Sequence, residues 1–257
     1  MTNNYHTHTT RCHHAKGTER EYVEAAIESG LKVLGFADHT PYPFPGGYSA
    51  HIRMNMDELE DYVDTVLSLK KEYEKDIEIH LGLEVEFFPQ FFPELLSYAS
   101  QYPIEYFLLA QHFLDNSKDC EPYSGTATDN VQYLIRYCEQ IMQALDTGRF
   151  TYLAHPDLFH FTGDYTTYST HMRRLCKHTK KLNIPLEINF LGLADNRHYP
   201  NPFFWQIAGE EGCDVIFGID AHSPEAFRFE DPLKKAHDMV DRYRLNLLED
   251  ITFRNPF

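Results

Sequence analysis

Seven short apolar runs alternate along the 257 residues with longer stretches of helical period, and this alternation constrains the fold most strongly. The expected strands are 3–6, 33–38, 77–84, 106–111, 151–155, 186–190 and 214–219. The expected helices lie near 18–30, 55–75, 90–101, 129–146, 167–182, 202–212 and 224–245. Repeated strand–helix units build a parallel sheet, and seven units are about enough to close it. The sequence therefore predicts an α/β fold, a TIM-like (βα)7 barrel one unit short of the eightfold form.

One domain is expected over residues 1–257. The chain is 42% hydrophobic, which supplies a large core, and no internal repeat or Gly/Ser-rich linker divides it. Helix-end signals support the helical stretches: Thr18 and Glu21 form a capping-box pattern, and Gly30 and Gly212 stand at expected helix C-caps.

Potential metal ligands stand at the ends of nearly all these runs, with one more in the first loop. They are His6, His8, His14, His39, Glu84, His112, His155, Asp220 and His222. Strand ends and the loops after them form the catalytic face of such barrels, so these side chains should meet at one mouth. His6 and His8 point to the same side of an extended segment, and Glu84 is a natural bridge because a carboxylate can bind two ions. The residues alone do not select between His13 and His14.

The other histidines are interpreted differently. A surface or core position is expected for six of the 15, and a core position is favoured for His80. The six are His51, His160, His171, His178, His198 and His237. Asn189 also ends an expected strand, whereas Asp38 and Asp157 lie beside ligands and either orient imidazoles or act as caps or surface carboxylates. Aromatic residues after strands contact a substrate or, more often, pack; these are Tyr42, Phe44, Tyr48, Phe159 and Phe161.

The charge balance argues against a nucleic-acid partner. Lys and Arg number 23 against 39 Asp and Glu, a net charge of −16, and no basic cluster appears. The five cysteines, Cys12, Cys120, Cys138, Cys176 and Cys213, lack a CxxC spacing and are expected to be reduced structural thiols. The first residues resemble no secretory signal and no long apolar segment follows, so a soluble cytoplasmic protein without a membrane span is expected. The oligomeric state is left open.

These motifs together resemble the polymerase and histidinol phosphatase (PHP) family. They are His6-Thr7-His8, His14 in CHHAKGT, Ala37-Asp38-His39, Gly82-Leu83-Glu84, Gln111-His112, His155-Pro156-Asp157 and Gly218-Ile219-Asp220-Ala221-His222. The resemblance covers residues 6 to 222 and selects His14 over His13. It implies a distorted seven-stranded βα barrel with a trinuclear metal site at its mouth.

The resemblance also implies how the ligands divide among three divalent ions, which are zinc, manganese or iron according to supply. The first ion would be held by His6, His8, Glu84 and Asp220. The second would be held by Glu84, His112 and His155. The third would be held by His14, His39 and His222.

Within the family, the segments HHAKGTEREYV, GFADHTPYP and INFLGLADNRHYPN are most similar to the monofunctional histidinol-phosphate phosphatases. That implies hydrolysis of L-histidinol phosphate to L-histidinol and phosphate in histidine biosynthesis. Arg197 takes the place of an expected phosphate-binding arginine, and Arg197, Glu84 and Asp220 are the expected catalytic residues. Lys16 and Arg53 are weaker candidates for anion binding, and His198 or a water molecule would protonate the leaving group.

Two other functions remain open at this stage. One is a phosphoesterase of the same family that acts on nucleotides or short oligonucleotides, which the acidic balance disfavours. The other is a metal-binding module without catalysis, which would need neither a complete ligand set nor Arg197.

Overall fold

A computed structural model describes residues 1–48, 50–114 and 122–257, and within them eight parallel strands form one sheet in sequential order. The strands are β1 (Asn3–Asn4), β2 (Val33–His39), β3 (Glu78–Val85), β4 (Tyr106–Leu109), β5 (Phe150–Leu153), β6 (Leu186–Asn189), β7 (Asp214–Gly218) and β8 (Asn246–Leu247). Because each strand pairs in parallel with the next, all carboxyl ends lie on the same side of the sheet.

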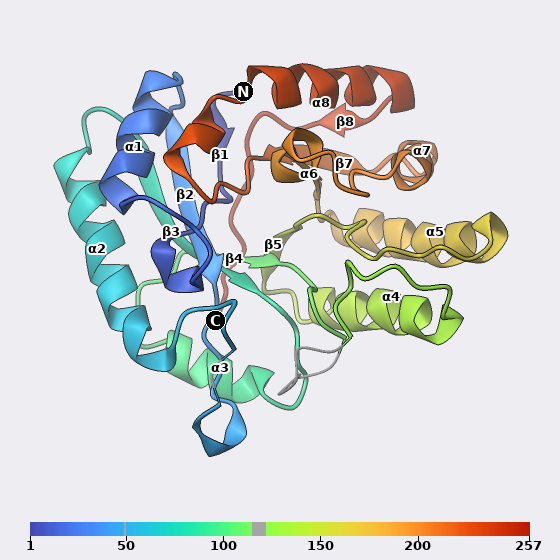
Figure 1. The fold of residues 1–257 in the computed structure, drawn as a ribbon, viewed down its shortest axis with the longest axis horizontal. Helices are drawn as coiled ribbons and strands as arrows, with labels where there is room; N and C mark the ends of the chain where they lie inside the picture. The colour runs from blue at the N-terminus through green and yellow to red at the C-terminus, as the bar shows by residue number, and fades with distance from the viewer. Residues whose placement is uncertain (49, 115–121) are drawn as a thin grey trace.

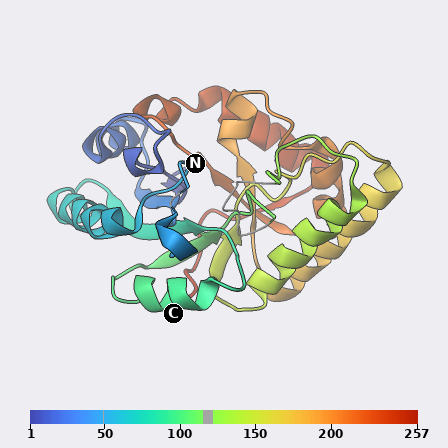
Figure 2. The ribbon, with the colours of Figure 1, turned by 60° about the horizontal axis from the view of Figure 1, so that its bottom comes forward.

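Helices surround the strands (Figures 1 and 2). They are α1 (Glu19–Glu28), α2 (Leu59–Glu72), α3 (Phe92–Ala99), α4 (Val131–Leu145), α5 (Tyr165–Leu182), α6 (Phe190–Ala194), α7 (Pro202–Glu210) and α8 (Glu230–Tyr243). Short 3-10 helices are η1 (Thr10–Cys12), η2 (Pro45–Gly47), η3 (Met56–Glu58) and η4 (Pro224–Phe227). The predicted capping box of Thr18 and Glu21 is present at the start of α1. In the described ranges, no helix is long and apolar enough to cross a membrane.

The seven predicted strands are present, but the count of seven is wrong, because the described residues contain an eighth strand. Asn246–Leu247 pairs with Asp214–Val215 of β7. This strand has two residues and lies outside any apolar run, so its pairing depends on the folded position of the chain and not on a local pattern. Helix α6 was also not predicted, since its five residues are too few to show a helical period.

The sheet curls until the segment after its first strand meets the segment after its seventh. Beyond β1 and β7, Thr7 and Ala221 form an isolated parallel bridge. The N–H of His8 donates to the Ala221 carbonyl at 2.9 Å, and the N–H of Ala221 donates to the His6 carbonyl at 3.2 Å. This bridge brings the segment after the first strand beside the segment after the seventh, as a barrel mouth requires.

Apolar side chains form two clusters, a large one between strands and helices and a small one inside the curled sheet. Tyr106 is the centre of the inner cluster, and its hydroxyl donates to the carbonyls of Tyr5 at 2.8 Å and Phe36 at 3.1 Å. The C-terminal segment covers this end of the interior, with the Phe253 ring stacked 4.6 Å from that of Tyr106. The interior beneath the mouth is therefore a packed core.

Gly82 leaves room for the Tyr106 ring, since a Cβ at Gly82 would lie 2.3 Å from Tyr106 Cζ. Gly82→Ala is expected to lower the free energy of unfolding by about 1–3 kcal/mol through overpacking, as measured by urea denaturation. In a Tyr106→Leu background the same substitution should cost much less. Equal costs in both backgrounds would show that the contact with the ring is not the cause.

Candidate metal centre

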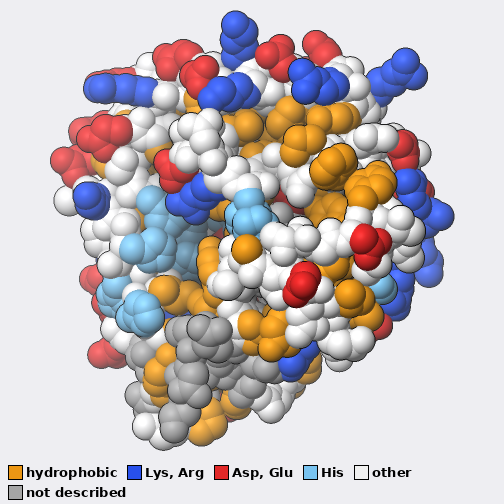
Figure 3. All heavy atoms as spheres, turned by 45° about the vertical axis from the view of Figure 1, so that its right-hand side comes forward, with side chains coloured by type: hydrophobic (Ala, Val, Ile, Leu, Met, Phe, Trp, Pro, Cys, Tyr) orange, Lys and Arg blue, Asp and Glu red, His pale blue; other side chains and the backbone are white. Residues whose placement is uncertain are grey.

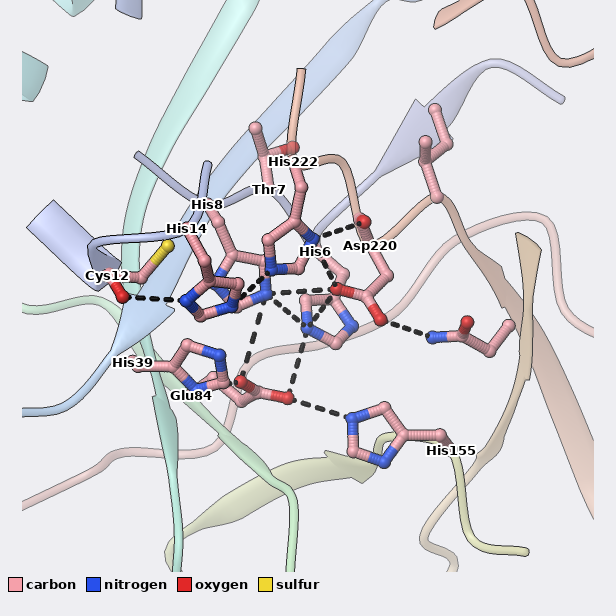
Figure 4. A network of polar contacts seen from close by, with 12 residues as sticks. His6, Thr7, His8, Cys12, His14, His39, Glu84, His155, Asp220 and His222 are labelled. Atoms are coloured by element: carbon pink, nitrogen blue, oxygen red, sulfur yellow. Dashed lines mark hydrogen bonds and ion pairs between the residues drawn. The ribbon is translucent and has the colours of Figure 1, made fainter. Parts of the chain in front are cut away.

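The nine ligand-type side chains predicted at the mouth do converge there. Figure 4 shows all of them except His112. His39 is the last residue of β2, and Glu84 lies next to the last residue of β3. The other seven follow β1, η1, β4, β5 or β7. Their nitrogen and oxygen atoms form overlapping triads within 4.8 Å of one another, and every one of the nine belongs to at least one triad. The parallel order of the strands therefore places the residues as the sequence predicted.

Glu84 lies at the centre of the group and is 2% exposed. Its Oε1 atom lies 3.1 Å from His6 Nε2 and 3.0 Å from His155 Nε2, and its Oε2 atom lies 2.7 Å from His39 Nδ1. His112 Nε2 is 4.0 Å from Oε1. Both carboxylate oxygens thus face imidazole nitrogens from different strands, which is the arrangement that a bridging ligand needs.

A second cluster lies toward the outer side of the mouth. His14 Nε2 and His222 Nε2 are 3.0 Å apart, and with His39 they form one of the triads. His13 adopts a left-handed conformation with φ of 66°, and its Nε2 lies 3.9 Å from Glu58. The structure thus places His14 in a triad, in agreement with the resemblance, whereas His13 lines the same cavity but belongs to none of the triads.

Four of the histidines are oriented by a hydrogen-bond acceptor at Nδ1. His6 Nδ1 contacts Glu187 Oε1 at 2.7 Å, and His8 Nδ1 contacts Asp38 Oδ1 at 3.3 Å. His14 and His222 contact the carbonyls of Cys12 and Asp220 through Nδ1 at 2.7 and 3.0 Å. When Nδ1 donates a proton to such an acceptor, the lone pair is left on Nε2, the atom that faces the centre.

The chemistry of this donor set fits divalent metal ions. Burial lowers the pKa of His112 and His222 to about 3, so both rings are neutral near pH 7. Burial raises the pKa of Glu84 and Asp220, but the surrounding imidazoles outweigh it and lower both well below their usual values. Burial lowers the pKa of His6, His8 and His155, but nearby carboxylates outweigh it and raise all three, so these rings would release protons when metal binds. Neutral imidazoles and ionised carboxylates are the forms that bind zinc, iron and manganese. The Nε2 atoms of His6 and His8, 3.1 Å apart, need a shared proton or a cation between them.

Backbone strain occurs at two of the same residues. His155 has φ of 28° and Asp220 has φ of 55°, and each follows a strand. Residues other than glycine rarely have a positive φ, and those that do are often found at functional sites.

The centre opens into a cavity of about 650 Å³. Figure 3 shows histidine side chains gathered in a hollow of the surface. Arg197, Asp195, Tyr199, Phe113 and Tyr123 line the same cavity. The Arg197 guanidinium donates to Asp195 Oδ2 from Nη2 at 2.8 Å and to the Tyr199 hydroxyl from Nη1 at 3.0 Å. Nε also donates to Asp195 Oδ2, at 3.1 Å, so Arg197 lies on the cavity wall with a hydrogen bond at each of its three nitrogens.

The weaker expectations have mixed outcomes. Asp38 contacts a histidine ring, but Asp157 accepts from the Asn201 N–H and from Trp205 Nε1 at 3.0 Å, so it holds a loop. Arg53 is buried against Glu86 and does not line the cavity. His80 contacts Glu105 at 2.7 Å, far from the centre.

The aromatic and cysteine predictions have mixed outcomes. The cavity is lined by Phe113, Tyr123 and Tyr199 and by none of the five aromatic residues proposed from the sequence. Cys12, Cys138, Cys176 and Cys213 are free and buried, and Cys120 lies outside the described residues.

Three residues at the centre were missed. Glu187 contacts His6 Nδ1, and its Oε2 accepts from the His155 N–H at 3.0 Å. A carboxylate inside the otherwise apolar strand 186–190 was an available signal. The Cys12 sulfur belongs to a triad with His8 and His222, which no spacing rule indicates. Glu86 accepts from the N–H groups of His112 and Phe113.

Comparisons with known proteins agree with the site. A family model described as PHP domain matches residues 4–190. A probable histidinol-phosphatase from Deinococcus radiodurans is 27% identical over 266 residues, which cover 97% of this chain and 95% of that protein. The histidinol-phosphatase of Bacillus subtilis is 32% identical over 126 residues, 46% of this chain and 47% of that protein.

A similar fold occurs in the crystal structure of histidinol phosphate phosphatase from Lactococcus lactis subsp. lactis, which is complexed with zinc, L-histidinol and phosphate. The TM-score is 0.75 at 17% identity, over 99% of this chain and 98% of that one. This similarity supports a curled parallel α/β fold of the TIM-like barrel type.

Asn189 connects two carboxylates at the centre. Its Nδ2 donates to Glu187 Oε2 at 2.9 Å and to Asp220 Oδ2 at 3.0 Å, and its Oδ1 caps α6 by accepting from Gly192. Asn189→Asp keeps the cap but removes both donors and adds a buried like charge. We expect the free energy of unfolding to fall by about 3 kcal/mol in urea denaturation with a chelator present.

Asn130→Asp is the matched control for this prediction. Asn130 caps α4 through the same contact but is exposed, so the change there should be neutral or slightly stabilising. A loss at Asn189 no larger than at Asn130 would contradict the bridging role.

Proposed function

The chain belongs to the PHP domain family, since the family model matches more than half of it, and from this premise we propose that it is a metal-dependent histidinol-phosphatase. The reaction is hydrolysis of L-histidinol phosphate to L-histidinol and phosphate, a step of histidine biosynthesis. Relatives that match over nearly the whole chain carry this activity in their names. The observation that supports it most is Arg197 on the wall of the cavity that six of the nine ligand-type residues also line.

We infer that three divalent ions bind at the carboxyl ends of the strands. His6, His8, Glu84 and Asp220 would hold the first ion. Glu84, His112 and His155 would hold the second, and His14, His39 and His222 the third. Glu84 is suited to bind both the first and the second ion, because each of its two carboxylate oxygens can bind one of them. Bound ions of this kind act as Lewis acids that activate water and neutralise phosphoryl oxygens, the two obstacles to hydrolysis of a phosphate monoester.

Arg197 would bind the phosphate of the substrate. Asp195 and the Tyr199 hydroxyl hold the guanidinium through one N–H of each nitrogen. The second N–H groups of Nη1 and Nη2, which have no partner among the described residues, would form charge-assisted hydrogen bonds with phosphoryl oxygens. Because two residues fix the planar group, little conformational freedom is lost when phosphate binds. Arg197 also supplies positive charge beside an acidic protein surface, where a dianion would otherwise be repelled.

The substrate is tested by phosphate release from L-histidinol phosphate, AMP, a short oligonucleotide and an aryl phosphate. The protein is first reconstituted with zinc or manganese, and a chelated sample serves as the control. We expect kcat/KM for histidinol phosphate to exceed the others by about 100-fold, a difference of about 2.7 kcal/mol, and activity to disappear with the chelator. A profile that favours AMP or the oligonucleotide would assign the nucleotide-directed activity instead.

Arg197→Ala is expected to lower kcat/KM for histidinol phosphate by about 10²–10³-fold, because it removes donors to a charged phosphoryl group. Bound metal, measured by elemental analysis, should stay at the wild-type level. Arg197→Lys should recover only part of the loss, since an ammonium group lacks the planar fork.

Arg228→Ala serves as the control, because Arg228 is exposed and does not line this cavity. Its kinetics should equal those of the wild type. Wild-type kinetics in Arg197→Ala would remove Arg197 from the mechanism.

A further inference from the structure

We propose that Glu86 is a positioning residue for His112, and that Arg53 holds Glu86 in place and so links the segment after β2 to the metal centre. The inference rests on the proposed function, in which His112 binds a metal ion. Neither residue touches the cavity. Their role is to fix the direction in which the His112 ring projects.

His112 lacks the support that other ligand-type histidines have. Within the described ranges, its Nδ1 atom is buried and has no hydrogen-bond partner, whereas Nδ1 of His6 and of His8 contacts a carboxylate. A ring without such an acceptor can be oriented only through its packing and its backbone. The main chain at residue 112 is therefore where this ligand has to be fixed.

Glu86 provides that contact. Its Oε1 accepts from the N–H of His112 at 3.1 Å and from the N–H of Phe113 at 2.8 Å. The regular ladder between β3 and β4 has ended here, its last bond running from the Ala110 N–H to the Val85 carbonyl. A single buried carboxylate thus continues the attachment of the strand beyond the sheet, with hydrogen bonds to a charged acceptor that are stronger than neutral ones.

His155, the second ligand-type histidine without an acceptor at Nδ1, is held at its backbone in the same way. His155 Nδ1 also has no partner among the described residues, and the His155 N–H donates to Glu187 Oε2 at 3.0 Å. Two histidines that lack an acceptor at Nδ1 are each held at the backbone by a buried glutamate. Because the same contact occurs at both histidines that lack an acceptor at Nδ1, we infer that Glu86 positions His112 and does not merely fill space.

Arg53 balances the buried charge of Glu86. Its Nη2 donates to Glu86 Oε2 at 2.5 Å, and both residues are 4% exposed. The guanidinium carbon lies 5.7–5.8 Å from the ring centres of Tyr42, Phe44 and Phe88, within the range of cation–π attraction.

Two more hydrogen bonds hold the segment after β2, one to Glu86 and one to His39. The Tyr42 hydroxyl donates to the Glu86 carbonyl, and the Met54 N–H donates to the His39 carbonyl at 3.4 Å. His51 and Ile52, next to Arg53, line the cavity. The Arg53–Glu86 ion pair therefore joins this wall of the cavity to the segment that carries His112.

The test measures zinc binding to the full chain by equilibrium dialysis, which does not depend on turnover. Four proteins are compared: wild type, Glu86→Gln, His112→Ala and the double variant. We expect Glu86→Gln to weaken zinc binding at one site by about 10–100-fold, the usual effect of removing an outer partner of a ligand. In the His112→Ala background, Glu86→Gln should cause no further loss, because the residue acts through His112.

Glu105→Gln is the matched control. Glu105 also accepts a backbone N–H, from Leu81 at 3.1 Å, and pairs with Lys70 at 2.6 Å, but it lies at the opposite end of the same strands. Its zinc binding should equal that of the wild type. An equal loss in Glu105→Gln, or the same loss from Glu86→Gln with and without His112, would overturn the proposal.

Two further outcomes separate this inference from the proposed function. A wild-type protein that binds zinc and hydrolyses histidinol phosphate, with unchanged zinc binding in Glu86→Gln, overturns the positioning role alone. A wild-type protein that binds no zinc overturns both. If Glu86→Gln fails to fold by circular dichroism, Arg53→Met carries the test, since it keeps an apolar stem among the rings and leaves Glu86 unpaired. Wild-type zinc binding in that variant also overturns the proposal.

Discussion

The buried carboxylate of Glu84 is the group around which the rest of the structure is arranged. A charge in this position is costly unless other groups compensate it. The compensating nitrogens of His6, His39 and His155 belong to segments far apart in the sequence, and they reach Glu84 only because the parallel sheet curls until its carboxyl ends face one centre. The Thr7–Ala221 bridge completes the ring and brings Asp220 to within 3.0 Å of His8. The curl of the sheet and the charge at its mouth are thus two aspects of one constraint.

Around this centre the protein orients imidazoles in two ways. Where an acceptor can reach the ring, it holds Nδ1, as Glu187 does for His6 and Asp38 for His8. Where no described acceptor reaches the ring, a buried carboxylate holds the backbone, as Glu187 does for His155 and Glu86 for His112. Glu187 serves both purposes and is itself held by Asn189. A network of this kind sets the direction of each lone pair before any ligand binds, which limits the ordering that binding requires.

The sequence predicted the parts of this arrangement that follow from local pattern. The alternation of short apolar runs with stretches of helical period located seven strands. The ligand-type residues at the ends of these strands identified the centre, because a parallel strand order brings those ends together. Contacts that depend on tertiary packing were not predictable. Asn246–Leu247 becomes a strand only when β7 offers an edge, and Arg53 is buried only because three aromatic rings and Glu86 surround it. Asp157 has the spacing of an imidazole partner, but the fold presents Trp205 and Asn201 to it instead.

The contacts of Asp157 bear on the position of Arg197. Asp157 stands two residues after His155, and its carboxylate accepts from the N–H of Asn201, four residues after Arg197. Trp205 Nε1 donates to the same oxygen at 3.0 Å, and the Trp205 side chain is fully buried in the core. Asp157 is 1% exposed, so its hydrogen bonds are formed away from water, where they are strong, and the same burial raises its pKa to about 7. The segment with the proposed phosphate-binding arginine is therefore fixed to the strand end that supplies His155. The spacing between guanidinium and imidazoles follows from the core, although Arg197 itself lies in a loop.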